Sequence, residues 1–111
     1  IGLVEATLGE MLDIKPIISI NPEGKYYTFC KVRSRKKSLD KIADIIHGMV
    51  AGKRINLAVM HGDALEEARQ MLDRLLKLPD VHPEEVVFGQ IGPVMVVHTG
   101  PGLLGIAVQQ L

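Results

Sequence analysis

The residues best suited to chemistry are a histidine and a threonine at the entrance of a glycine-proline turn. His98 and Thr99 follow an apolar run, residues 94–97, and Gly-Pro-Gly comes directly after them. Two glycines allow backbone angles that side chains forbid, and Pro101 fixes one φ between them. We therefore expect a stiff turn with open N–H groups, which suits an anionic or polar ligand group. The alternative is a tight connection whose histidine packs in the core.

A second candidate is a basic run that follows a predicted hairpin and begins a predicted helix. Arg33 and Ser34 are followed by Arg35, Lys36 and Lys37. Cations at a helix N-terminus interact unfavourably with the helix dipole. The run is therefore either a solvated basic surface or a place where an anion lies nearby.

Hydrophobic periodicity and turn chemistry predict the elements that must position these residues. We expect three helices: over residues 2–12, from about Leu39 to Gly52, and from an Asp63–Glu66 capping box to about Leu78. We expect two strands over 15–20 and 26–32, joined by a turn at 21–24. Three more strands are expected over 54–60, 85–90 and 103–109, and the first of these ends in a His61-Gly62 turn. This order predicts an α/β fold with a mixed sheet, an N-terminal antiparallel hairpin and packed helices.

Composition narrows the class of protein. A length of 111 residues fits a single domain, and a formal net charge of +0 gives no overall field that would recruit nucleic acid. No apolar run is long enough to cross a bilayer. The single Cys30 cannot form an internal disulfide, which fits a cytoplasmic location, and we expect it to be a small buried side chain. The sequence begins with Ile1 in mid-pattern, so we expect a piece of a longer protein.

The remaining polar candidates have simpler structural interpretations. We expect His61, at the end of a strand, to bond backbone in the adjacent loop, and His47 and His82 to lie in solvent. A helix start explains Asp63 and Glu66 without acid–base chemistry. No Cys/His grouping has zinc-ligand spacing, so we expect neither a metal nor a cofactor.

Several motifs, taken in order along the chain, resemble the DegV family of bacterial fatty-acid-binding proteins. They are Lys-Pro-Ile-Ile-Ser-Ile at 15–20, Lys-Val-Arg-Ser-Arg-Lys-Lys at 31–37, Ala-Val-Met-His at 58–61, Ile-Gly-Pro-Val at 91–94 and His-Thr-Gly-Pro-Gly at 98–102. The resemblance extends over most of the chain and implies a DegV C-terminal domain, residues 1–111, from a two-domain protein.

The resemblance implies a binding function without catalysis. In the family, a long-chain fatty acid lies in an apolar tunnel between two domains, and a separate fatty acid kinase phosphorylates its carboxyl group. The matching head-group residues here are Arg33 and His98, and we add the neighbouring Thr99. The family's other hydroxyl groups come from an N-terminal domain that this sequence does not include. The candidate tunnel-lining residues are Met60, Met95, Val97 and Ile106.

One departure from the family pattern lies beside the histidine, and two other functions remain open. The family usually has Gly-Thr before this histidine, whereas this chain has Val96-Val97, which could tighten the tunnel mouth. One alternative is a hydrolase or transferase with His98 as general base and Arg33 as an anion clamp, although no activated Ser or Cys nucleophile is recognisable. The other is a scaffold domain that dimerises and binds no ligand.

Overall fold

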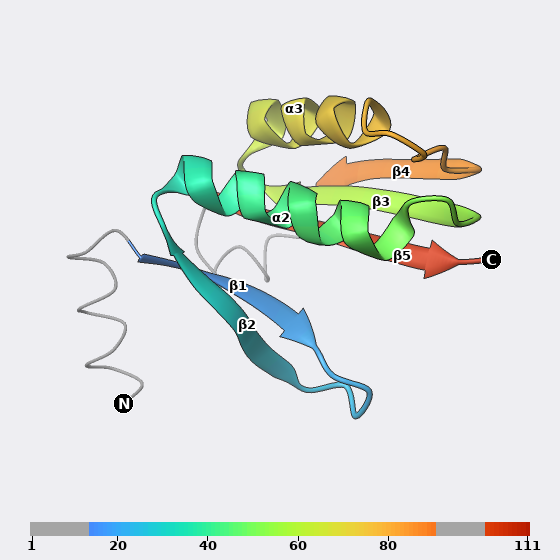
Figure 1. Ribbon diagram of the computed structural model, residues 1–111. Coiled ribbons are helices and arrows are strands. Elements are labelled where there is room, and N and C mark those ends of the chain that lie inside the picture. The colour runs from blue at the N-terminus through green and yellow to red at the C-terminus, as the bar shows by residue number, and fades with distance from the viewer. Residues whose placement is uncertain (1–13, 91–101) are drawn as a thin grey trace. The chain divides into compact units, whose positions relative to one another are not determined.

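The computed structural model describes residues 14–90 and 102–111. The elements in chain order are β1 (Ile14–Ile20), β2 (Tyr26–Arg33), α2 (Arg35–Val50), β3 (Ile55–Gly62), α3 (Leu65–Leu76), β4 (Glu85–Gln90) and β5 (Leu103–Gln110), as labelled in Figure 1. They fall into two compact units, residues 1–45 and 46–111, and the boundary lies within α2. The α/β class, the hairpin and the mixed sheet are confirmed. The helix predicted over residues 2–12 lies outside the described residues.

The first unit contains the predicted antiparallel hairpin. In β1 and β2, Ile20 lies opposite Tyr26 and Ile14 lies opposite Arg33, with a bulge near the middle of the ladder. Asn21 fixes the turn, because its side-chain Oδ1 accepts the backbone N–H of Lys25 at 2.9 Å. Asparagine side chains favour turns through such local bonds, which explains why the sequence predicted this turn correctly.

The second unit is built on a three-stranded sheet in the order β4-β3-β5. The central β3 is parallel to β4 and antiparallel to β5, so the sheet is mixed. The strand is longer than predicted: His61 and Gly62 belong to it, and His61 pairs with both Gln90 and Leu104. The predicted His61-Gly62 turn is therefore wrong, because cross-strand pairing on both sides extends β3 through these residues.

Alternation along β3 places the core of this unit on one face of the sheet. Ile55, Leu57 and Val59 are almost fully buried, and successive strand residues point to opposite faces. Helix α3 lies across the sheet in Figure 1 and contacts β3. The helix contributes buried side chains at helical spacing: Ala68, Met71 and Leu75.

Local chemistry predicted two helix boundaries, the end of α2 and the start of α3. Helix α2 ends at Val50, and Gly52 takes a φ of +74°, as expected for a glycine that ends a helix. The predicted Asp63–Glu66 capping box is wrong. Asp63 has a φ of +55°, and the cap position falls one residue later on Ala64, which has no side-chain cap.

Candidate functional site

Arg33 is the last residue of the hairpin and is exposed to solvent. Its backbone is fixed by the pairing of β2 with β1, in which it lies opposite Ile14. Because side chains alternate along a strand, Arg33 shares its face of the hairpin with Lys31. The site thus has an exposed guanidinium at the end of an ordered strand.

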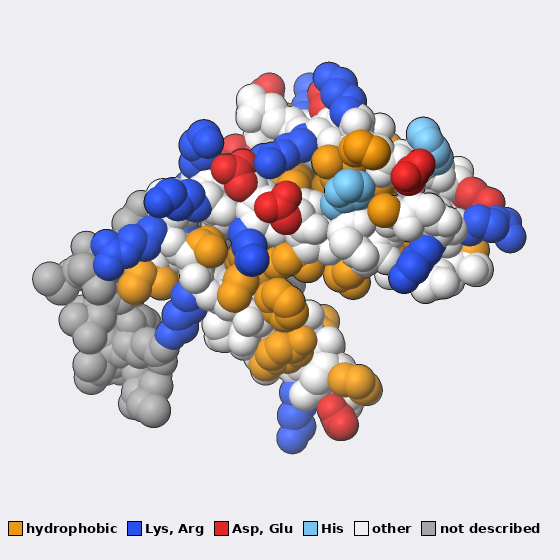
Figure 2. All heavy atoms as spheres, in the orientation of Figure 1, with side chains coloured by type: hydrophobic (Ala, Val, Ile, Leu, Met, Phe, Trp, Pro, Cys, Tyr) orange, Lys and Arg blue, Asp and Glu red, His pale blue; other side chains and the backbone are white. Residues whose placement is uncertain are grey.

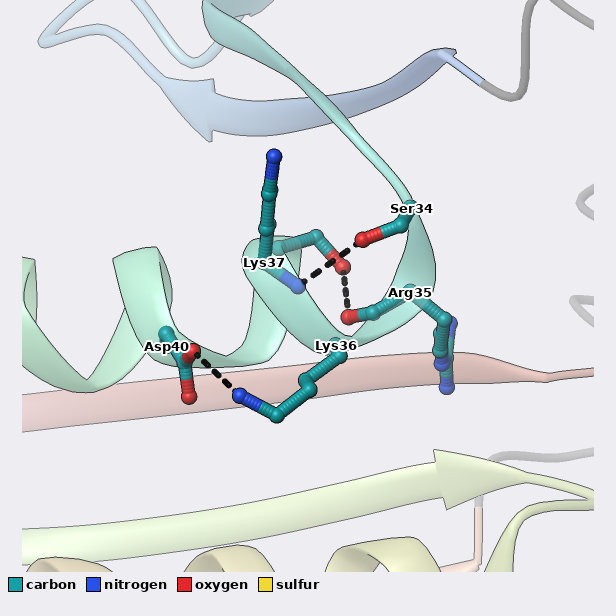
Figure 3. Close-up of polar contacts among 6 residues, drawn as sticks. Ser34, Arg35, Lys36, Lys37 and Asp40 are labelled. Atoms are coloured by element: carbon teal, nitrogen blue, oxygen red, sulfur yellow. Dashed lines mark hydrogen bonds and ion pairs between the residues drawn. The ribbon is translucent and has the colours of Figure 1, made fainter.

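A single residue, Ser34, joins β2 to α2. Its φ is +70°, a left-handed conformation that costs roughly 1–2 kcal/mol for a residue with a side chain. Two hydrogen bonds hold it. The Ser34 Oγ accepts the N–H of Lys37 at 3.2 Å (Figure 3). The Ser34 carbonyl accepts the N–H of Ser38 at 3.1 Å. Ser34 therefore caps the helix while it reverses the chain directly after Arg33.

The basic run at the start of α2 does not converge on one point. In Figure 3 the side chains of Arg35, Lys36 and Lys37 point in different directions. Lys36 Nζ lies 3.5 Å from a carboxylate oxygen of Asp40, and Lys36 and Lys37 are exposed. An exposed ion pair of this kind contributes little to stability. This arrangement fits the solvated-surface interpretation for Lys36 and Lys37.

Positive charge is nevertheless concentrated in the part of the first unit that the structure describes, residues 14–45, whereas residues 1–13 add three acidic residues and no Lys or Arg. Residues 14–45 carry eight Lys or Arg residues and three Asp or Glu residues, in a chain whose formal net charge is zero. Figure 2 shows Lys and Arg side chains gathered around the first turns of α2. An anionic ligand group near Arg33 would therefore experience a local field that the overall composition conceals.

The predicted head-group residues His98 and Thr99 lie outside the described residues, as do the lining candidates Met95 and Val97. The described residues that border residues 91–101 both lie beside the end of β3. Gln90 pairs with His61, and the N–H of Gly102 donates to the carbonyl of Gly62 at 2.7 Å. The φ of Gly102 is +90°, which a residue with a side chain rarely adopts. In open α/β sheets, ligands bind beyond the carboxyl ends of the parallel strands, which is where these two borders lie.

His61 occupies this same end of β3, in a structural role. Only 5% of its surface is exposed, and its Nδ1 accepts the backbone N–H of Ala64 at 3.1 Å. The predicted backbone bond is therefore confirmed. Because Nδ1 is an acceptor here, the ring proton lies on Nε2. The ring also packs near Phe88, with centroids 5.9 Å apart.

The register of the sheet separates the two lining candidates that the structure describes. Ile106 lies opposite Val59, on the face that holds the buried core. Met60 lies opposite Gly105, on the other face, and is 38% exposed. A side chain built at Gly105 would meet nothing within 4 Å, so there is open space beside Met60's cross-strand partner. Met60 is therefore the better placed of the two to meet a ligand.

An exposed apolar surface on the hairpin was not anticipated from the sequence. It consists of large side chains that are at least 44% exposed, and we call it the hairpin surface: Ile18, Ile20, Tyr26, Tyr27 and Phe29. Figure 2 shows hydrophobic side chains exposed along this part of the molecule. The adjacent Cys30 is half-buried. The sequence could have predicted the hairpin surface, because apolar residues occupy successive positions of β2. Since successive strand residues point to opposite faces, this puts apolar groups on both faces of a two-stranded ribbon.

The other histidines have no role in this site. His47 was expected in solvent, and it is partly exposed but also makes a contact that was not predicted. The residue is half-buried, and its Nε2 lies 2.9 Å from the carbonyl oxygen of Pro79, because α2 lies against the loop after α3. His82 is exposed, as predicted.

Within residues 14–90 and 102–111, no group of three or more His, Cys, Asp or Glu residues could hold a metal ion. In the same ranges, no helix is long and apolar enough to cross a membrane.

Comparisons with known proteins agree on one family. A family model described as "Uncharacterised protein, DegV family" matches residues 1–111. A DegV domain-containing protein of Clostridium acetobutylicum is 43% identical over 108 residues, which are 97% of this chain and 38% of that protein. The chain thus spans well under half the length of this relative.

Solved structures give the same result. A protein from Streptococcus agalactiae, described as a fatty acid binding DegV family protein, is similar with a TM-score of 0.73 and 34% identity, covering 94% of this chain and 36% of that one. A DegV family protein from Thermus thermophilus, described by its fatty acid binding, has a TM-score of 0.76 and 29% identity, covering 97% of this chain and 38% of that one.

Proposed function

Because the chain belongs to the DegV family, we propose that it helps to bind a long-chain fatty acid and to present the carboxyl group of that acid for phosphorylation by a fatty acid kinase. The observation that supports this most strongly is the structural likeness to two DegV proteins described as fatty acid binding, at 34% and 29% identity. The chain itself acts as a binding protein and not as the enzyme.

Arg33, His98 and Thr99 form the proposed head-group set. A carboxylate drawn toward apolar surroundings must find compensating donors or charges. Arg33 supplies a permanently charged guanidinium with donors that match carboxylate geometry. His98 donates a hydrogen bond when neutral and adds charge when protonated, and Thr99 adds a hydroxyl donor.

The acyl tail supplies most of the affinity. Each buried CH₂ contributes about 0.8 kcal/mol, so a long tail outweighs one head-group contact. We propose that Met60, Met95 and Val97 line the tail site. We leave out Ile106 because it lies on the core face of the sheet, opposite Val59. Met60 lies on the sheet face opposite to the core, so we assign the tail to that face.

We further propose that the tunnel is completed by an N-terminal domain, since the matched relatives are more than twice as long as this chain. The hairpin surface supports this, because exposed apolar patches of several large side chains mark sites of association. The carboxyl group would then lie where both domains meet, available to a cytoplasmic kinase.

The test is identification of the lipid that accompanies the protein. The protein is purified in the longest form that its gene encodes, and an organic extract is examined by mass spectrometry. The proposal predicts long-chain fatty acids in near-stoichiometric amount. An extract that contains no fatty acid, from protein that also fails to take up added fatty acid, would refute it.

A further inference from the structure

We propose that Ser34 is a positioning residue that fixes where Arg33, at the end of β2, lies relative to the cationic first turn of α2, and thereby the positive charge that the ligand carboxylate meets. Ser34 need not touch the ligand itself. The inference rests on the proposed function, in which Arg33 binds the head group, and adds a residue that neither the motif nor the comparisons assign to the site.

The argument begins with the length of the connection. Arg33 is the last residue of β2 and Arg35 is the first of α2, so Ser34 is the entire link between strand and helix. The backbone angles of this one residue therefore set the angle between the two elements. Since pairing opposite Ile14 fixes Arg33 on the strand side, a change at Ser34 alters how Arg33 is directed relative to the cationic start of α2.

The next step concerns why a serine stands at this position. A φ of +70° is easiest for glycine, yet glycine would leave the link free to adopt other angles. Serine restrains it through the bond from the Lys37 N–H to its Oγ, 3.2 Å long. The neighbouring Ser38 is buried and donates from Oγ to the Arg35 carbonyl at 2.6 Å, a bond within the first turn of α2.

The position thus combines an unfavourable backbone angle with hydrogen bonds that lock it. A residue whose only task was to start a helix could do so with an ordinary negative φ at the cap position. The left-handed angle instead reverses the chain immediately after Arg33. Strained residues held by their surroundings are frequent at binding sites, where they provide a preorganised geometry.

The experiment separates this positioning role from a purely structural one. Three variants, Ser34→Gly, Ser34→Ala and Ser34→Asn, are made in the longest form of the protein that its gene encodes. For each, the melting temperature is measured, together with the ratio of the dissociation constants for palmitic acid methyl ester and palmitic acid. This ratio isolates the contribution of the charged head group, because both ligands have the same tail.

The matched control is Asp80→Gly. Asp80 also has a positive φ, +60°, and is exposed in the loop after α3, so the substitution relieves the same kind of backbone strain away from the hairpin–helix link. This variant should keep the wild-type ratio.

The proposal predicts that Ser34→Gly keeps a melting temperature near that of the wild type, because relief of strain offsets loss of the cap, while the ester-to-acid ratio falls severalfold. Ser34→Asn should restore the ratio, since asparagine both tolerates this angle and can cap a helix. Ser34→Ala should lower the melting temperature, because it loses the cap and keeps the strain.

Two results distinguish failure of this inference from failure of the proposed function. If the wild-type protein prefers the acid and Ser34→Gly keeps that preference, Ser34 does not position Arg33, and the proposed function stands. If the wild-type protein binds neither ligand, the proposed function itself fails and the positioning role fails with it.

Discussion

Replacing Arg33 with glutamine is the perturbation most informative about the head-group site. Glutamine keeps a side-chain donor of similar reach and removes the charge. Arg33 is exposed and its strand pairing uses backbone groups, so the substitution should leave the fold intact. The expected effect is therefore on ligand binding and not on stability.

The size of the effect follows from the setting of Arg33. Hydrogen bonds to charged groups contribute about 1.5–3 kcal/mol each. The exposed position of Arg33 places its contribution at the low end of that range. Since 1.4 kcal/mol corresponds to a tenfold change in affinity, Arg33→Gln should weaken binding of the acid by about tenfold. The methyl ester, which carries no charge, should lose much less.

The assay is isothermal titration of de-lipidated protein with palmitic acid and with its methyl ester. Lys31→Gln is the matched control, because Lys31 is an exposed cation on the same strand and the same face, two residues away. If both substitutions weaken the acid equally, general positive charge and not Arg33 is responsible. If neither does, the assignment of Arg33 to the head group is wrong.

Three further predictions concern stability and turnover. Leu75→Ala, at a fully buried position in α3, should lower the free energy of unfolding in urea by about 2–5 kcal/mol, and the same change at the exposed Leu76 should cost far less. Glu84→Gln breaks an exposed ion pair with Arg54, 2.8 Å long, and should change the free energy of unfolding by less than about 1 kcal/mol. A larger loss would show that this pair is more than a surface contact. If the proposed fatty acid kinase acts on the bound acid, His98→Gln should reduce acyl-phosphate formation while titration shows that tail binding is retained. Parallel loss of both would indicate a structural histidine.

Much of the fold could be predicted because it depends on short-range chemistry. Asn21 determines the hairpin turn through its own side chain, and Gly52 ends α2 with a positive φ. The buried alternation of β3 likewise reflects its sequence directly. In each case the information lies within a few residues of the feature.

The errors and the missed contact arose where distant segments decide the outcome. Pairing with β4 and β5 draws His61 into β3, and neither partner is close to it in the sequence. The carbonyl of Pro79, far along the chain, gives His47 a contact that its helix alone does not reveal. At Asp63, a left-handed backbone angle moved the cap to Ala64, a change that residue types at the predicted spacing did not indicate.

In the candidate site, too, some features could be predicted from local sequence and others could not. Arg33 could be proposed as a head-group residue from its motif, but the left-handed angle of Ser34 that follows it could not be predicted, since serine is not the usual residue for that conformation. Met60 and Ile106 were both plausible lining residues by type. Only the cross-strand register shows that they project from opposite faces of the sheet.

Direct titration of the de-lipidated protein with palmitic acid tests the central claim most directly. The protein should be used in the longest form that its gene encodes, with a short-chain acid of the same head group as the comparison. The account predicts saturable binding of palmitic acid at one site and far weaker binding of the short acid, because buried CH₂ groups supply the affinity. Equal affinity for both acids, or no saturable binding of either, would contradict it.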